Sequence, residues 1–232
     1  MLACACSAAT NAAEVTAATL TNDDVAYLTQ LSLIRGHAKV GHELFAEGEV
    51  EAARSHGRHP RDELYAPLVT TFTARRTSGF ATELDGLRQS MDRADESEAL
   101  AYTTLTAAIA RAEQALGSRP VQTATVVAVI INLLREAAAE YDEAFIDGKL
   151  SNAHEYQDAY GFTQIALTWA QDLGNSNDPQ IRRVAQRISS ELADLAVMWP
   201  ALMPPNRVQT KAAQLLGAAA RVEIAALDLA TP

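Results

Sequence analysis

Hydrophobic residues recur along most of the chain at the spacing of amphipathic α-helices. Leu33, His37, Val40 and Leu44 follow such a spacing and share one helix face. Residues 121–146 carry a longer stripe of the same kind, and no convincing run of strict alternation predicts a β-strand. We therefore expect an all-α fold without a sheet, an antiparallel bundle of about six to eight helices with short connections.

Capping residues and helix breakers indicate where these helices begin and end. The first long helix should end near Gly48, followed by a short helix over residues 49–55 and a turn at residues 56–60. Pro60 can then open the next helix, because its missing N–H is not needed in a first turn. The other boundaries predict a first helix that begins after Thr21 or Asn22 and later helices over residues 61–90, 96–116, 121–146, 153–173 (capped by Asn152), 179–198 and 206–229.

The composition favours one helical domain behind a short flexible segment. Hydrophobic residues make up 48% of the 232 residues, which is enough for a substantial core. No linker rich in Gly, Ser or Pro divides residues 21–232, although the halves 21–116 and 120–229 allow two stacked sub-bundles as an alternative arrangement. Residues 1–20 are rich in Ala and Thr, and we expect them to be a signal remnant and flexible tether.

The first residues resemble the end of a bacterial lipoprotein signal, in which a small residue precedes a lipidated cysteine. Cys4 and Cys6 are the candidates for lipidation, although the charged and apolar regions of such a signal are missing, so a truncated signal and a coincidence both stay open. No segment approaches about 18 consecutive apolar residues, so we expect no transmembrane helix. These features predict a periplasmic or membrane-anchored extracytoplasmic protein of bacterial type.

Net charge and missing motifs exclude several functions. The formal charge of −10 argues against non-specific nucleic-acid binding and is compatible with cation binding. The chain has no phosphate-binding loop, no Gly-x-Gly-x-x-Gly, no Gly-x-Ser-x-Gly and no His-Glu-x-x-His motif. We therefore do not expect an enzyme.

Four of the five histidines fall between residues 37 and 59. His37 lies on the apolar face of its predicted helix between Gly36 and Gly41, and glycines inside a helix are easier to explain where a neighbouring helix or a ligand must come close. His42 should point away from His37 and lie at the surface. Imidazoles together with a carboxylate suit zinc, copper, iron or nickel. The metal ligands predicted on this basis are His37, His56, His59 and Glu63.

A purely structural interpretation of the same residues, without ligand binding, stays open. A buried histidine can simply hydrogen-bond to a neighbouring backbone or carboxylate group, and the segment around His56 and His59 can be a solvated polar loop. Arg58 and Arg61 add positive charge there, which would suit an anionic ligand or a carboxylate partner better than a metal.

A second, weaker candidate lies around the turn at residues 147–151. Acidic residues precede and follow this turn on two helices that should be antiparallel neighbours, so their carboxylates can face one another. The default interpretation is a solvated acidic face. The alternative is a carboxylate metal site whose ligands are Glu140, Glu155 and Asp158.

Residues 140–156, which read Glu-Tyr-Asp-Glu-Ala-Phe-Ile-Asp-Gly-Lys-Leu-Ser-Asn-Ala-His-Glu-Tyr, resemble a helix-turn-helix in the extracytoplasmic helical domain of bacterial high-affinity iron permease family proteins. A weaker similarity links Gly57-Arg58-His59 to the Gly-x-His-x-x-Glu motif of imelysin-like periplasmic proteins, with Glu63 one place late. Both resemblances imply secreted helical bundles linked to metal uptake, mostly of iron. Neither implies an enzyme.

The resulting hypothesis is a secreted or lipid-anchored helical protein that binds a transition-metal ion in metal uptake or handling. Iron or copper is the foremost candidate, and zinc also fits the ligands. The expected partner is a membrane permease or another periplasmic protein, with the oligomeric state open. The alternative is a non-catalytic structural or interaction subunit that packs against a membrane or periplasmic partner.

Overall fold

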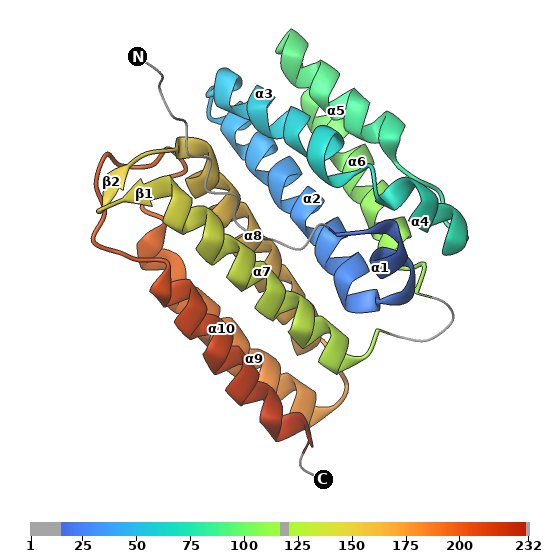
Figure 1. Ribbon diagram of the computed structural model, residues 1–232, viewed down its shortest axis with the longest axis vertical. Helices are drawn as coiled ribbons and strands as arrows, with labels where there is room; N and C mark the ends of the chain where they lie inside the picture. Colours follow the sequence, from blue (N-terminus) through green and yellow to red (C-terminus); the bar gives the residue numbers. More distant parts are fainter. Residues whose placement is uncertain (1–14, 117–120, 231–232) are drawn as a thin grey trace, which may run out of the picture.

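Ten α-helices account for most of residues 15–116 and 121–230, which the computed structural model describes (Figure 1). They are α1 (Ala17–Asn22), α2 (Asp24–Ala46), α3 (Val50–His59), α4 (Leu68–Ala74), α5 (Ala81–Arg93), α6 (Glu98–Glu113), α7 (Thr123–Ala144), α8 (Ala153–Gly174), α9 (Pro179–Ala193) and α10 (Ala213–Ala226). The all-α fold is therefore confirmed. The number of helices exceeds the expected six to eight because α1 and α4 are short additional helices.

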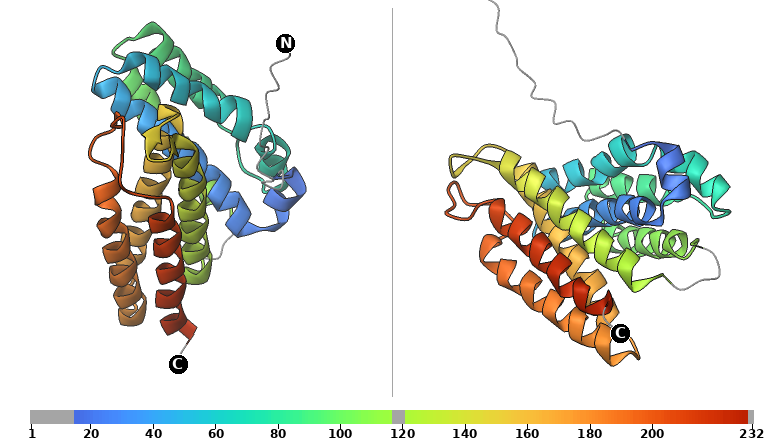
Figure 2. Two further views of the ribbon diagram at one scale, coloured as in Figure 1. Left: turned by 60° about the vertical axis from the view of Figure 1, so that its left-hand side comes forward. Right: turned by 60° about the horizontal axis from the view of Figure 1, so that its bottom comes forward.

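The second half of the chain forms a four-helix bundle from α7, α8, α9 and α10 (Figures 1 and 2). In this bundle α7 packs against α8 and α10, and α9 packs against the same two helices. The apolar stripe expected on residues 121–146 faces inward, with Ile130, Leu134 and Tyr141 buried. Burial of such a stripe is the main source of stability for a helix of this length.

In the first half of the chain, α2 lies between the other helices and the second half. It packs against α3 and α6 on its own side and against α7 and α8 of the four-helix bundle (Figure 2). The outer helix α5 packs against α3 and α6, and α1 packs against α4. The contact between α2 and α8 therefore joins two stacked groups of helices, which matches the alternative arrangement expected from the sequence.

Two glycines lie at the crossing of α2 and α8. A Cβ atom added to Gly36 would lie 2.6 Å from Cδ1 of Phe162, and one added to Gly161 would lie 2.8 Å from the carbonyl oxygen of Gly36. At Gly41, where α3 approaches α2, an added Cβ would lie 3.3 Å from Cβ of His56. The sequence-based interpretation of Gly36 and Gly41 as points of close helix approach is confirmed.

The prediction of a turn at residues 56–60 is wrong. Helix α3 continues to His59, and the chain then passes through a π-helical turn at Pro60–Leu64. Pro60 has no N–H to continue the α-helical hydrogen-bond ladder, and here the backbone widens into a π turn instead of leaving the helix. The single helix expected over residues 61–90 is divided into this turn, α4 and α5.

A small β-hairpin also contradicts the expectation of no sheet. Strands β1 (Phe145–Ile146) and β2 (Lys149–Leu150) pair through a turn in which Asp147 and Gly148 both have positive φ. Such a turn matches the twist of a hairpin, and an Asp-Gly pair adopts it readily. The last helix was expected from residue 206, but Asn206 and Val208 instead make backbone hydrogen bonds to the hairpin.

Near the amino terminus, the last residues of the expected tether form α1, and Leu20 is buried. Helix α2 is capped by Asp23, whose side chain accepts hydrogen bonds from the N–H groups of Val25 and Ala26, rather than by Thr21 or Asn22. Cys4 and Cys6 lie outside the described residues, so lipidation stays a prediction. None of the described helices combines the length and apolar character that crossing a membrane requires.

Candidate metal centre

Helix α8 presents two polar side chains on one face near its start. Asn152 caps the helix as expected, because its side-chain oxygen accepts a hydrogen bond of 3.0 Å from the N–H of His154. His154 and Asp158 are one helical turn apart, so they share a face. That face is turned toward α2 and α3, and Nε2 of His154 lies 3.2 Å from Oδ2 of Asp158.

Four side chains from three helices converge at this point. His37 comes from α2, His56 from α3, and His154 and Asp158 from α8. One possible ligand atom of each lies within 4.8 Å of those of the other three. His37, His56 and Asp158 are buried, while His154 is partly buried. We call these four residues the histidine–aspartate centre.

Three atoms of the histidine–aspartate centre lie close together without a well-aligned hydrogen bond. Nδ1 of His37 is 2.6 Å from Oδ1 of Asp158, and Nδ1 of His56 is 3.1 Å from the same oxygen. Within the described residues none of these buried atoms has a partner in hydrogen-bonding geometry. An unsatisfied buried polar atom costs about 1–3 kcal/mol, so a proton or a metal ion shared among the three would be strongly favoured.

Gln157 orients the ring of His56. Nε2 of His56 lies 2.9 Å from Oε1 of Gln157, an oxygen that can only accept a hydrogen bond. Nε2 therefore carries the proton, and Nδ1 is the atom directed at Asp158. Such an outer hydrogen bond, which fixes the tautomer of a histidine, is typical of metal ligands.

Two members of the centre are held in the protonation state that binds metal. Burial lowers the pKa of His154 to about 3, with further lowering from the neighbouring His56 ring, so His154 is neutral near pH 7. Burial of Asp158 favours its neutral form, but attraction to the rings of His37 and His56 outweighs burial and holds the pKa of this carboxyl well below its usual range. A neutral imidazole and an ionised carboxylate are the forms that coordinate metals.

Of the four ligands expected from the first half of the chain, the structure brings His37 and His56 into the centre and leaves His59 and Glu63 beside it. Nδ1 of His59 lies 2.9 Å from Nε2 of His154, and Nε2 of His59 lies 2.9 Å from Oε1 of Glu63. The expected convergence of all four residues is therefore not found. His56 and His59 were expected in a loop, but they lie one turn apart on the continuous helix α3, and both rings contact the ring of His154. Only His56 also reaches Asp158, while His59 lies nearer the surface.

The sequence interpretation missed His154 and did not group Asp158 with the histidines. Asp158 was assigned to a carboxylate site with Glu140 and Glu155; in the structure its carboxylate lies against three histidines, and its charge also acts on those two glutamates. The available signal was the spacing of His154 and Asp158, one turn apart on a helix with a strong cap. That spacing indicates a shared face, but it does not say which helix that face meets.

Glu140, Glu143 and Glu155 form a second group whose ligand atoms also lie within 4.8 Å of one another. The pKa of Glu140 is raised to about 9, first by burial and then by the negative charges of Glu155 and Asp158. The pKa of Glu155 is also raised, mainly by burial. The proximity of Glu140 and Glu155 agrees with the expectation from the sequence, and a metal site there stays a prediction.

His42 lies outside the centre, as its position on the helix indicated. Its Nδ1 is 2.9 Å from Oε2 of the buried Glu98, and its ring stacks on Tyr102 with the centroids 4.1 Å apart. This histidine was expected at the surface and is in fact half-buried between α2 and α6. It provides a matched control for experiments on the other histidines.

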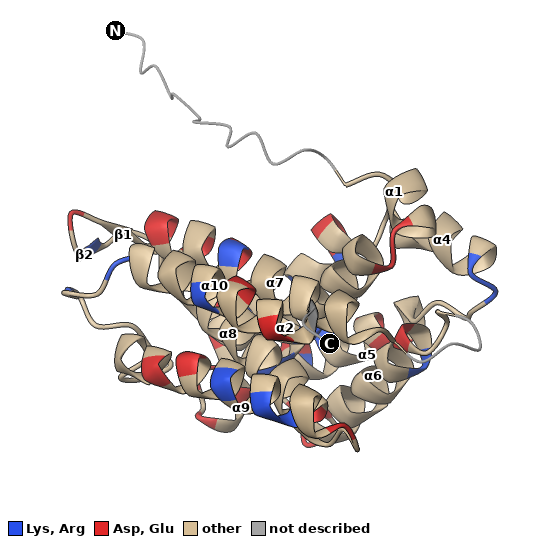
Figure 3. Cartoon of the chain, turned by 90° about the horizontal axis from the view of Figure 1, so that it is seen from below, with Lys and Arg blue, Asp and Glu red and all other residues tan. Residues whose placement is uncertain are grey.

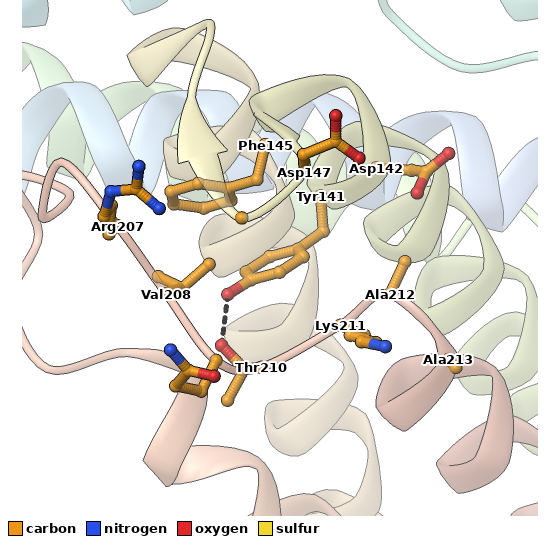
Figure 4. Close-up of a pocket in the computed structure, with 12 residues that line it drawn as sticks. Tyr141, Asp142, Phe145, Asp147, Arg207, Val208, Thr210, Lys211, Ala212 and Ala213 are labelled. Atoms are coloured by element: carbon orange, nitrogen blue, oxygen red, sulfur yellow. Dashed lines mark hydrogen bonds between the residues drawn. The ribbon is translucent and has the colours of Figure 1, made fainter.

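Among the described residues, surface charge and the cavity at the end of α7 show no second cluster of histidines like this centre. On α9 the basic residues gather at one end of the helix and the acidic residues at the other, and α10 carries few charges (Figure 3). A cavity of 580 Å³ opens between the end of α7, the hairpin and residues 207–213, where Tyr141 and Thr210 share a hydrogen bond of 2.6 Å (Figure 4). None of the four residues of the histidine–aspartate centre lines it.

Comparison with known proteins supports the resemblance seen in the sequence. Residues 117–226 match the family model of the iron permease-associated 4-helix bundle domain. That range includes α7 to α10, and it contains His154 and Asp158 but not His37 or His56. No curated protein and no solved structure matches the chain significantly. Residues 117–226, which are 110 of the 232 residues, are thus similar to the iron permease-associated 4-helix bundle domain.

Proposed function

We propose that this protein reversibly binds a transition-metal ion at the histidine–aspartate centre and serves metal uptake or handling outside the cytoplasm. The observation that carries the proposal is the convergence of Nδ1 of His37, Nδ1 of His56 and Oδ1 of Asp158 in a buried position without aligned hydrogen-bond partners. A metal ion coordinated by all three would satisfy them together. His154 would provide a fourth ligand.

The ligand set indicates the class of metal. Three imidazoles and one carboxylate suit iron, copper, zinc and nickel, and are unlike the all-oxygen sites that calcium and magnesium require. The family match favours iron, and copper and zinc are the alternatives. Protons compete with metal for imidazole nitrogens, so the affinity should fall below about pH 6.

The proposed location and partner follow from the family match. An iron permease-associated domain would act beside a membrane permease, receiving the ion before transport or releasing it to the permease. The ligands of the centre come from two parts of the chain, which fits this role. The segment that matches the family contributes His154 and Asp158, and α2 and α3 contribute His37 and His56. We propose no catalytic activity.

Elemental analysis and calorimetric titration with iron, copper, zinc and nickel at pH 5–8 test the proposal. The wild-type protein should bind one ion with an affinity that decreases toward pH 5. The variant Asp158→Asn should lose about 100-fold or more in affinity, because it removes the only charged ligand. His42→Ala is the matched control and should bind like wild type. No binding by the wild type, or unchanged binding by Asp158→Asn, would contradict the proposal.

The alternative function, an interaction subunit, also has a specific observation in its favour. The outer side of α10 and the following turn exposes a stripe of apolar residues, formed by Leu216, Ala220, Ile224 and Leu227. Exposed apolar stripes of this kind often mark protein contacts. Light scattering coupled to size-exclusion chromatography tests it: a stable oligomer that Leu216→Glu and Ile224→Glu dissolve, in a protein that binds no metal, would favour this function.

A further inference from the structure

We propose that His59 and Glu63 form an outer binding station through which a borderline divalent cation enters and leaves the buried histidine–aspartate centre. This inference rests on the proposed function, because it assigns a route to the ion that the centre holds. It gives His59 and Glu63 a role in the rate of exchange and not in the final coordination.

Exposure decreases step by step along a continuous chain of ligand atoms. The side chain of Glu63 is 62% exposed and that of His59 33% exposed, while His154 and Asp158 are 16% and 2% exposed. Each member lies within contact distance of the next: Glu63 to His59 at 2.9 Å, His59 to His154 at 2.9 Å and His154 to Asp158 at 3.2 Å. A hydrated ion can thus exchange water for protein ligands one at a time.

His154 connects the outer station to the centre. Its Nε2 atom lies close to both Nδ1 of His59 and Oδ2 of Asp158, so the same nitrogen is available to an ion on either side. For an ion held by Glu63 and His59, the ring of His154 is the next ligand inward, and Asp158 lies immediately beyond it.

The outer station opens onto a groove at the surface. Glu63 lines a groove of 690 Å³ together with Gln30 and Glu136, between the start of the described chain, α2 and α7. Glu136 adds a second carboxylate to the wall but makes no described contact with His59. Glu63 is therefore the carboxylate that can take up a cation from this groove and pass it directly to His59.

The π-helical turn Pro60–Leu64 determines the position of Glu63. It places the carboxylate of Glu63 on the side of His59 that faces away from His154, so that His59 lies between the two. Gln30 of α2 holds the end of this turn by donating a hydrogen bond of 2.8 Å to the carbonyl oxygen of Leu64. π-Helical turns inside helices are often found at functional sites, where they re-aim a side chain.

Stopped-flow absorbance with Co²⁺ at pH 7 tests this inference, because Co²⁺ reports its ligand geometry in its visible spectrum. Association is measured on mixing with Co²⁺, and release on mixing the loaded protein with excess EDTA. Glu63→Gln is a conservative change at an exposed side chain, so the fold is retained, and we expect both rates to fall about tenfold. The dissociation constant should change less than about threefold and the Co²⁺ spectrum should stay that of wild type. His59→Ala should show the same pattern more strongly.

Glu136→Gln is the matched control, since it removes a carboxylate from the same groove without touching the chain of ligands. We expect its rates to stay within about twofold of wild type at 0.15 M salt, where exposed charges are screened. Unchanged rates in Glu63→Gln and His59→Ala, or an equal slowing in Glu136→Gln, would overturn the inference. So would a changed spectrum with a large loss of affinity, which would make these residues ligands of the final site. Failure of wild type to bind Co²⁺ or any of the other metals would instead overturn the proposed function itself.

Discussion

Nδ1 of His37 lies 2.6 Å from Oδ1 of Asp158, across the crossing of α2 and α8. The contact joins a residue of the first half of the chain to a residue of the segment that matches the iron permease-associated 4-helix bundle domain. It is possible only because Gly36 and Gly161 let the two helix backbones approach closely. The packing of the two halves and the assembly of the centre therefore depend on the same crossing.

The substitution Gly161→Ala should disturb both the packing of the two halves and the histidine–aspartate centre. The added methyl group would lie 2.7 Å from Cγ2 of Val40 and 2.8 Å from the backbone oxygen of Gly36, which cannot move without shifting α2. We expect a loss of about 1–3 kcal/mol in the free energy of unfolding, measured by urea denaturation, together with weaker metal binding. Gly86→Ala is the control: nothing lies within 4 Å of an added Cβ there, so the variant should be about 0.5–1 kcal/mol more stable.

Gln157→Leu should weaken metal binding without removing a ligand. Without the amide oxygen that accepts from Nε2, the ring of His56 loses its fixed tautomer and orientation. We expect the affinity for metal, measured by competition with a chelator, to fall by about 10–100-fold. Gln171→Leu changes an exposed residue of the same helix and should bind metal like wild type. Equal affinity of the two variants would show that Gln157 has no role in the centre.

Much of the fold follows from signals that lie close together in the sequence. The apolar stripe of residues 121–146 predicted α7, and Asn152 predicted the start of α8, because periodicity and capping act within a few residues. Breaks inside helices were harder to place. The π turn at Pro60 is held by a hydrogen bond from Gln30, which lies on another helix. The last helix was predicted to start too early because residues 206–208 pair with the hairpin. A local sequence pattern contains neither contact.

The candidate site shows the same limit more clearly. His37 was predicted from its place on an apolar face and from the neighbouring Gly36, and both features are local. His154 was missed because its partners His59 and His56 lie about a hundred residues earlier, and only the packing of α8 on α2 and α3 brings them together. Asp158 was seen as a candidate but given acidic partners, because its own helix and the preceding one are rich in acidic residues.

Acid should destabilise the metal-free protein through His154. Its pKa is lowered to about 3 in the folded protein, whereas a histidine in the unfolded chain titrates near about 6.5. Below pH 6.5 the unfolded state therefore takes up a proton that the folded state excludes, and stability falls as the pH decreases toward 3. Thermal unfolding from pH 7 to 4 should show a steeper loss for wild type than for His154→Gln. Parallel curves would contradict this assignment.

Glu140 should have the opposite dependence on pH. Its pKa is raised to about 9 in the folded protein, mainly by burial, so the folded state retains a proton that the unfolded state releases above about pH 4.5. The stability contributed by the neutral carboxyl is present below pH 4.5 and is lost as the pH rises toward 9. Glu140→Gln mimics the neutral form at every pH. We expect it to be more stable than wild type by about 0.5–2 kcal/mol at pH 8, with no difference at pH 4. If Glu140, Glu143 and Glu155 instead hold a cation, added metal should stabilise wild type at pH 8 and leave Glu140→Gln unaffected, which separates the two roles of this group.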